Sequence, residues 1–311
     1  MKSIYIRASL LFAFLLCLNT SCLETEPQST IFDALQERGD FDIFLEAVQI
    51  VGFDNALRNG SPITVFAPTD DAFASFLSDR GISTLSEIDI EELRDIVLYH
   101  LLGTTIPLSG LRSAYFLTPS TAGNEGNFVA IYVEDVGNGE YRLNGTANVI
   151  LKDQNTFGGF YNSIDQVLEL PTIFDMLEQN EDFSLMLAGI NSSPEVKTIL
   201  TEEDSSHTFL LVPDEDLEED LSATYGVSSL TELSEGLRDS LLKAHTLPGY
   251  FRGQDLGDPF AGDFETLLED FNISVVGSTR LILNEGPEVS IANIQAKNGV
   301  IHTVNGLLSP K

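Results

Sequence analysis

Residues 64–73 read Thr-Val-Phe-Ala-Pro-Thr-Asp-Asp-Ala-Phe. The first four form an apolar run of strand length, and Pro68 has no amide hydrogen with which to continue a central strand. Thr69 or Asp70 then supplies the side-chain oxygen that caps the first turn of a helix. This stretch therefore predicts a short buried strand leading directly into a helix. It also indicates that Asp70 caps that helix, because no base or nucleophile accompanies it in the sequence.

A second copy of this pattern indicates that the chain is an internal duplication. Residues 208–212 form another apolar run, which ends at Pro213, 145 residues after Pro68. The sequence Thr-Ile-Phe-Asp occurs at residues 30–33 and again at 172–175. A period this long is typical of duplicated domains rather than of a solenoid. We therefore predict one domain over residues 30–171 and a second over residues 172–311.

Each copy follows the same order of predicted elements, with helices first and strands later. An amphipathic helix opens the first copy at Ile31, and a second helix begins near Ser86, where Asp89 suggests a capping box. The last third of each copy is rich in predicted strands, at residues 127–136, 141–143 and 149–151, then 273–276, 281–283 and 289–295. This order favours an α+β fold for both domains.

Three stretches resemble the fasciclin domain family. Residues 64–73 are similar to its first signature block, and Tyr99-His100 resembles its central Tyr-His pair. Residues 298–305, Asn-Gly-Val-Ile-His-Thr-Val-Asn, resemble its second block. The resemblance covers about residues 30–311. It implies two tandem fasciclin-like domains, each a wedge of β-strands with helices packed at one end. It also implies adhesion or matrix-type binding outside the cytoplasm, without reaction chemistry.

The two copies depart from that pattern in different places. The first has Asn162 where the second has His302, and the second has Ala244 where the first has Tyr99. Residues 211–217 of the second copy, Leu-Val-Pro-Asp-Glu-Asp-Leu, are a degraded form of the first block.

The histidines are the candidate site residues with the most distinctive positions. His100 and His245 each end an apolar helical stripe, which favours a packed ring with satisfied hydrogen bonds over a ligand-binding role. The resemblance implies receptor contact by the region of Tyr99 and His100 as the alternative. His302 alternates with apolar residues, so we interpret it as a strand histidine. A metal role would need partners, and cysteine ligands are absent from the mature chain.

The first 21 residues resemble the signal peptide of a bacterial lipoprotein. Lys2 and Arg7 precede an apolar run at residues 8–18, which is far shorter than the roughly 20 residues of a membrane span. Small residues then lead to Cys22, where lipidation would occur, although Asn19 replaces the usual aliphatic residue. We predict a leader over residues 1–21, a tether over 22–29 and lipid anchoring at the bacterial outer membrane or cell surface. The alternative is an ordinary secretory peptide with an incidental cysteine.

Composition limits the partners of the mature chain. The only other cysteine, Cys17, lies within the leader, so no disulfide is available. Without the leader the chain keeps 14 basic and 48 acidic side chains, a net charge of −34. Such a surface repels nucleic acid and anionic membranes. The acidic residues between Asp214 and Asp220 lack the glycine and distal glutamate of a calcium loop, which favours a solvated helix face.

These observations predict a binding protein rather than an enzyme. The sequence has no G-x-S-x-G, H-E-x-x-H, P-loop or G-x-G-x-x-G motif, and we expect no cofactor and no metal. The predicted function is that of an envelope-anchored lipoprotein for adhesion or surface binding, with a protein or cell-surface ligand. The alternative is an accessory glycan-binding lipoprotein of a polysaccharide-uptake system. The chain lacks tryptophan, which counts against an aromatic sugar platform.

Overall fold

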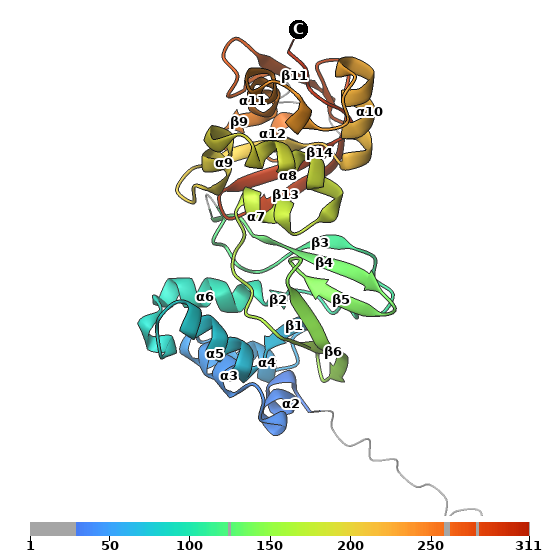
Figure 1. The fold of residues 1–311 in the computed structure, drawn as a ribbon. Coiled ribbons are helices and arrows are strands. Elements are labelled where there is room, and N and C mark those ends of the chain that lie inside the picture. Colours follow the sequence, from blue (N-terminus) through green and yellow to red (C-terminus); the bar gives the residue numbers. More distant parts are fainter. Residues whose placement is uncertain (1–28, 124–125, 258–261, 278–279, 311) are drawn as a thin grey trace, which may run out of the picture.

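A computed structural model shows two α+β domains stacked end to end (Figure 1). The structure describes residues 29–123, 126–257, 262–277 and 280–310. The N-terminal domain runs from α2 to β7 and the C-terminal domain from α7 to β14, with residues 165–172 joining them. The predicted leader, the lipidation site at Cys22 and all but the last residue of the tether lie outside the described residues. No described helix is both long and apolar enough to cross a membrane.

The N-terminal domain begins with its helices. They are α2 (Ile31–Arg38), α3 (Asp42–Ile50), α4 (Asp54–Arg58), α5 (Asp70–Asp79), the 3-10 turn η1 (Leu85–Glu87) and α6 (Ile90–Tyr99). The predicted opening helix is interrupted after Arg38, because Gly39 adopts φ of 72° and ends α2 in the left-handed conformation. The predicted capping box at Ser86 and Asp89 is wrong. Thr84 and Glu87 form a capping box around η1, and Asp89 caps α6 separately.

A seven-stranded sheet completes the N-terminal domain, in the order β2-β1-β7-β6-β5-β4-β3. Its strands are β1 (Ile63–Pro68), β2 (Leu101–Leu102), β3 (Ala114–Leu117), β4 (Ala130–Gly137), β5 (Glu140–Leu143), β6 (Ala147–Thr156) and β7 (Gly159–Ile164). The first and last of the long strands, β1 and β7, pair in parallel, and the other neighbours are antiparallel. All six residues of β1 are buried, as the apolar run at residues 64–67 predicts.

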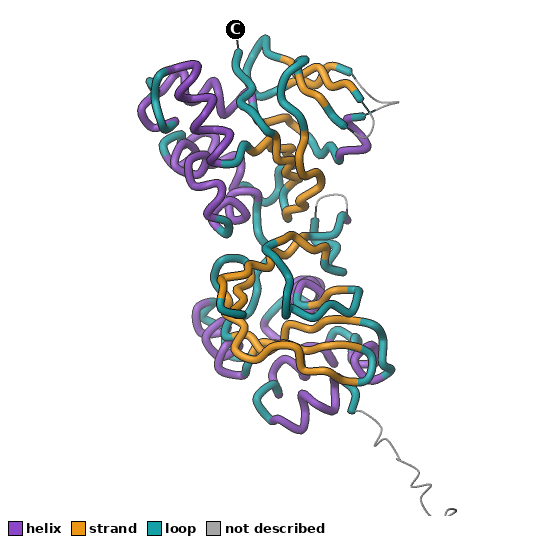
Figure 2. The backbone as a smooth tube through the Cα atoms, turned by 90° about the vertical axis from the view of Figure 1, so that its right-hand side faces the viewer, coloured by secondary structure: helices purple, strands orange, loops and turns teal. Residues whose placement is uncertain are grey.

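The C-terminal domain repeats this plan. Its helical elements are α7 (Ile173–Glu178), η3 (Glu181–Phe183), α8 (Ser184–Asn191), α9 (Pro194–Thr201), α10 (Asp214–Tyr225), η4 (Leu230–Glu232), α11 (Glu235–Ala244) and α12 (Gly253–Leu256). Its strands are β8 (His207–Leu211), β9 (Thr246–Pro248), β10 (Asp263–Glu265), β11 (Asn272–Val276), β12 (Ile282–Leu283), β13 (Val289–Ala296) and β14 (Gly299–Val304). Most of its helices lie to one side of its strands (Figure 2).

The second sheet is divided where the first is continuous. Strands β13-β14-β8-β9 form one sheet and β10-β11-β12 another, and the two are joined by a bridge between Ile282 and Glu288 with the backbone hydrogen bonds beside it. Pro287 stands 140 residues after Ala147, which pairs with Leu143 in the first sheet. Pro287 still accepts a hydrogen bond from the amide of Leu283, but it has no amide hydrogen with which to make the reciprocal bond, so the pairing is weakened at this point.

The two domains share one hydrophobic core. One buried cluster is confined to the helical end of the N-terminal domain and includes Leu35, Phe44 and Phe73. The second cluster starts on the opposite side of the N-terminal sheet, with Phe66 and Ile131, and continues without a break into the C-terminal domain. Because apolar burial is the main stabilising term in folding, this shared cluster couples the two domains.

Candidate functional site

His100 links the C-terminal end of α6 to the last segment of the N-terminal domain through hydrogen bonds. It directly follows α6 and is fully buried. Its Nδ1 lies 2.7 Å from the carbonyl oxygen of Ile96, and the amide of Leu168 donates to Nε2 over 2.9 Å. Because Nε2 accepts a hydrogen bond, the ring hydrogen is on Nδ1 and is donated to Ile96. Burial lowers the pKa of His100 to about 4, so the ring is neutral near pH 7.

His245 occupies the same position in the second domain. It follows α11 and is also fully buried. Its Nδ1 lies 2.6 Å from the carbonyl oxygen of Leu210, and the amide of Leu308 donates to Nε2 over 2.8 Å. Burial again lowers the histidine pKa to about 4. Both rings therefore have their two nitrogen atoms engaged within the fold. A receptor could contact either ring only after it had been exposed.

His302 and Asn162 are equivalent residues on the central strands β14 and β7. The His302 Nδ1 accepts a hydrogen bond from the amide of Asn293, and Nε2 donates to the carbonyl oxygen of Phe251 over 2.8 Å. Burial lowers the pKa of His302 to about 4. The Asn162 Oδ1 accepts the equivalent amide, that of Asp153, over 2.8 Å. Its Nδ2 is buried without a hydrogen-bond partner among the described residues.

A left-handed bulge residue organises this region in both domains. Asp153 has φ of 54° and Asn293 has φ of 66°, and each lies at an irregularity in its strand. The side chain of Asp153 accepts the amide of Leu108 over 2.6 Å, and that of Asn293 accepts the amide of Gly253 over 2.8 Å. Asp153 thereby holds the segment after β2 against the first sheet, and Asn293 holds the segment after β9 against the second.

Tyr99 lies beside His100 in the sequence but takes part in a different network. Its side chain is fully buried, and its hydroxyl donates to the carbonyl oxygen of Ala130 over 2.8 Å. The Tyr99 hydroxyl oxygen in turn accepts a hydrogen bond from the Nδ2 of Asn144 over 2.8 Å. Burial raises the pKa of Tyr99 well above its usual range. The side chain therefore connects α6 to the antiparallel part of the sheet, and Ala244 has no equivalent group.

Asp70 does cap a helix, but not the one that it begins. Thr69 is the N-cap of α5, whereas Asp70 accepts the amide of Ile43 in the first turn of α3 over 2.8 Å. Asp214 makes the equivalent contact, accepting the amide of Leu185 over 2.9 Å. A carboxylate at the start of a helix also interacts favourably with the helix dipole. Each aspartate therefore joins two helices.

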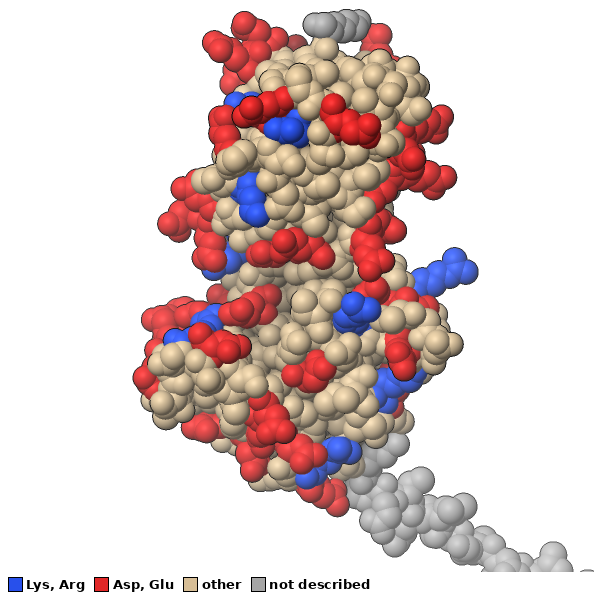
Figure 3. All heavy atoms as spheres, in the orientation of Figure 1, with Lys and Arg blue, Asp and Glu red and all other residues tan. Residues whose placement is uncertain are grey.

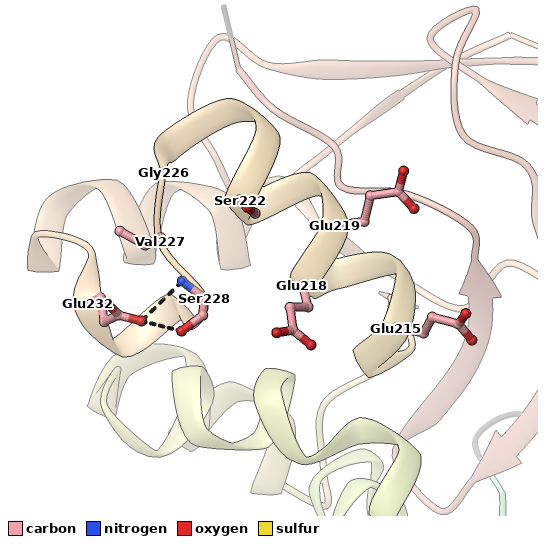
Figure 4. A pocket seen from close by; sticks show the side chains of 8 residues that line it. All are labelled: Glu215, Glu218, Glu219, Ser222, Gly226, Val227, Ser228 and Glu232. Carbon is pink, nitrogen blue, oxygen red and sulfur yellow. Dashed lines mark hydrogen bonds between the residues drawn. The ribbon is translucent and has the colours of Figure 1, made fainter.

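An acidic groove runs beside α10, lined by Glu215, Glu218, Glu219, Ser222, Gly226, Val227, Ser228 and Glu232 (Figure 4). Glu232 accepts hydrogen bonds from the amide and the hydroxyl of Ser228, which lower its pKa. Glu218 points into the space beneath the helix, whereas Glu215 and Glu219 extend along its outer side. Within the described parts of the chain, no group of three or more His, Cys, Asp or Glu side chains could hold a metal ion.

A second cavity of about 600 Å³ lies between the two domains. We call it the interdomain cleft and define it by Tyr115, Tyr132, Asp182, Phe183, Glu215 and Ile291. The two tyrosines are cross-strand neighbours on β3 and β4, with ring centroids 4.8 Å apart. Asn180 donates to the Tyr115 hydroxyl over 3.4 Å, so this face of the first sheet is in direct contact with the second domain.

The structure does not gather the predicted residues into one site. Tyr99 and His100 lie in the first domain, whereas His245 and His302 lie in the second and approach different neighbours. The interdomain cleft contains none of these residues, and the sequence analysis did not predict a site there. The bulge residues could have been found, because Asp153 and Asn293 are separated by the same 140 residues as Asn162 and His302.

Known proteins resemble the chain over most of its length. The family profile described as "Fasciclin domain" matches residues 39–171 and 181–310. The transforming growth factor-beta-induced protein ig-h3 of Sus scrofa is 25% identical over 292 residues, which cover 93% of this chain and 41% of that protein. Protein sll1483 of Synechocystis is 29% identical over 147 residues, covering 47% of this chain and 77% of that protein. The chain thus spans about two fifths of the length of the first of these relatives.

A solved structure has the same two-domain fold. It is described as a FAS1 domain pair from the insect cell adhesion molecule fasciclin I, and it matches with a TM-score of 0.55 at 19% identity. The match covers 88% of this chain and 98% of that one, which supports the tandem arrangement. The predicted fold of two tandem α+β domains is confirmed. With a matching domain in each half, this chain belongs to the fasciclin domain family.

Proposed function

We propose that the chain is a lipid-anchored binding protein of the bacterial envelope, without catalytic activity, whose pair of fasciclin domains adheres to a protein on another surface. Membership of the fasciclin family supports a binding role. The matched domain pair comes from a cell adhesion molecule, which supports adhesion as the form that the binding takes.

The proposal that the chain binds rather than catalyses rests on where its histidine and aspartate side chains lie. The family-like blocks contain His100, His302 and Asp70, and all three make hydrogen bonds that hold the fold together. Burial lowers the pKa of His100, His245 and His302 to about 4, so these rings do not exchange protons near pH 7. Because the rings are fully buried, they also cannot contact a substrate. Recognition is therefore assigned to the outer surface of the domain pair.

The surface charge sets the class of partner. Acidic side chains far outnumber basic ones over both domains on the face drawn in Figure 3. Of the 64 charged residues in the full sequence, 48 are acidic. Such a surface favours partners with basic patches and speeds their association at low ionic strength. A lipid at Cys22 would hold this surface beside the membrane through the short tether.

The test is adhesion of soluble protein to treated surfaces. Residues 23–311 are purified as one piece, because the shared core couples the two domains. The fluorescently labelled protein is applied to a panel of bacterial cells and matrix-coated surfaces, each untreated, digested with protease or oxidised with periodate. We expect binding that protease removes and that periodate leaves intact.

Two other outcomes would contradict the proposal. Binding that survives protease and is lost after periodate oxidation would identify a glycan ligand and favour the polysaccharide-uptake role. Absence of binding to every surface in the panel would refute adhesion. A preparation unfolded by heat controls for nonspecific attachment of an acidic protein.

A further inference from the structure

The interdomain cleft lies between two strands that stand at the ends of their sheets. β3 is the last strand of the N-terminal sheet and β13 is the last strand of the four-stranded C-terminal sheet, within the described residues. Tyr115 comes from β3 and Ile291 from β13, so both edges contribute to the cleft. An open edge offers backbone hydrogen bonds to an added strand.

The register of β3 shows which of its backbone groups face outward. Thr118 donates its amide to Val129, and Leu117 is paired with Ala130. Backbone groups alternate in direction along an antiparallel strand. The amide and carbonyl groups of Tyr115 and Leu117 therefore point away from β4. An extended peptide could bond to them as an eighth strand.

The walls of the cleft combine apolar surface with negative charge. Ile291 lines the cleft and is 52% exposed, whereas side chains of this size are usually buried. Leu117, two residues after Tyr115 on β3, is 49% exposed. Asp182 and Glu215 line the cleft and are exposed. Among the residues that the structure describes, no lysine or arginine lines it. Exposed apolar side chains beside carboxylates match a ligand that is both apolar and cationic.

The two tyrosines are neutral and lie close to these carboxylates. Burial raises the pKa of Tyr132, and the carboxylates of Glu134, Asp182 and Glu181 raise it further. A cation in the cleft would be stabilised by the same carboxylates and by the tyrosine ring faces. Tyr132 is only 6% exposed, so the pair forms a wall rather than an open platform on which a sugar could stack.

We propose that the interdomain cleft binds an extended segment of a partner protein that carries arginine or lysine together with apolar side chains. The segment would add to the open edge of β3, and the side chains at every second position would face the cleft, an apolar one against Ile291 and a cationic one between Asp182 and Glu215. This inference names a ligand class for the adhesive function proposed above and therefore rests on it.

The test uses a synthetic probe on the intact two-domain protein. A fluorescein-labelled hexapeptide of the sequence Val-Val-Arg-Arg-Val-Val, which carries both kinds of side chain on each face of an extended strand, is titrated with residues 23–311, and binding is followed by fluorescence anisotropy. In the control peptide, glutamate replaces both arginines. We expect saturable binding of the arginine peptide and none of the glutamate peptide. A third peptide, methylated at alternate backbone nitrogens, cannot form the strand ladder and should bind at least about tenfold more weakly.

Matched variants locate the binding. Asp182→Asn combined with Glu215→Gln removes two charges from the cleft. Glu218→Gln combined with Glu219→Gln removes two charges from the same acidic region without touching the cleft. All four side chains are exposed, so the thermal unfolding midpoint should not change. We expect the first pair to raise the Kd about tenfold and the second by less than about twofold.

Several results would overturn the inference. Equal weakening by both pairs of substitutions would show nonspecific attraction to an acidic surface. Unchanged binding of the methylated peptide would exclude strand addition. Competition by neutral oligosaccharides for the same cleft would make it a glycan site. If the cleft variant still adheres to the protease-sensitive surface as wild type does, the cleft assignment fails while the adhesive function stands.

Discussion

Replacing His100 by alanine tests whether this histidine stabilises the fold. The substitution leaves two buried backbone groups without partners, the carbonyl of Ile96 and the amide of Leu168. Each unsatisfied buried group costs about 1–3 kcal/mol, and the lost ring also removes packing against Phe44, whose centroid is 6.1 Å away. We expect the free energy of unfolding to fall by about 3–5 kcal/mol.

Urea unfolding followed by circular dichroism measures this change. His207→Ala is the matched control, because His207 is only partly buried and its Nδ1 has no hydrogen-bond partner in the described structure. It should change the free energy of unfolding by less than about 1 kcal/mol. His100→Gln should recover part of the loss, since an amide can donate to Ile96 and accept from Leu168. Equal unfolding curves for His100→Ala and His207→Ala would refute the reasoning.

Four further predictions concern the buried side chains and the lipid anchor. The three buried histidines have a folded-state pKa near 4 against about 6.5 when unfolded, so stability is complete above pH 6.5 and decreases as the pH falls towards 4. The loss should reach about 2 kcal/mol per histidine by pH 5, and urea midpoints that are equal at pH 7.5 and pH 5 would contradict it. Asn162→His should add about 1 kcal/mol by giving the first domain the Nε2 hydrogen bond that His302 makes, and a lower urea midpoint would instead indicate overpacking. Tyr99→Phe should cost about 1–2 kcal/mol through its lost hydroxyl bonds, and an unchanged melting temperature would show that they contribute nothing. Cys22→Ala should shift the protein from the membrane fraction to the soluble fraction or block its processing, and normal cleavage with full membrane retention would rule out the lipid anchor.

Much of the fold can be predicted from the sequence because its signals are local. The strand over residues 64–67 is a short apolar run bounded by turn residues, and the structure places a buried strand there. The duplication is equally visible, because the equivalent residues recur at nearly constant separations. The strand-rich last third of each domain also follows from short apolar stretches with polar ends.

The partners of the candidate residues could not be predicted, because they depend on contacts between distant segments. His100 bonds to Leu168, 68 residues away, and His245 bonds to Leu308, 63 residues away. The sequence shows a histidine at the end of an apolar stripe, which predicts burial but names no partner. Asp70 was identified as a capping residue, yet the helix that it caps lies earlier in the chain.

The interdomain cleft was not predictable for a related reason. It forms where β3 and β4 of one domain approach η3, α10, β13 and β14 of the other, so its residues come from six separate segments. Nothing in the local pattern around Tyr115 or Ile291 distinguishes them from ordinary strand residues. Only the packing of the two domains brings them together.

The most direct test of the whole account compares two variants on the surface that shows protease-sensitive adhesion. His100→Gln should lower stability but, at a temperature where it is fully folded, bind as tightly as wild type. Asp182→Asn with Glu215→Gln should keep its stability and bind about tenfold more weakly. The opposite result, a fully folded His100→Gln protein that no longer adheres beside a cleft variant that adheres normally, would contradict the account.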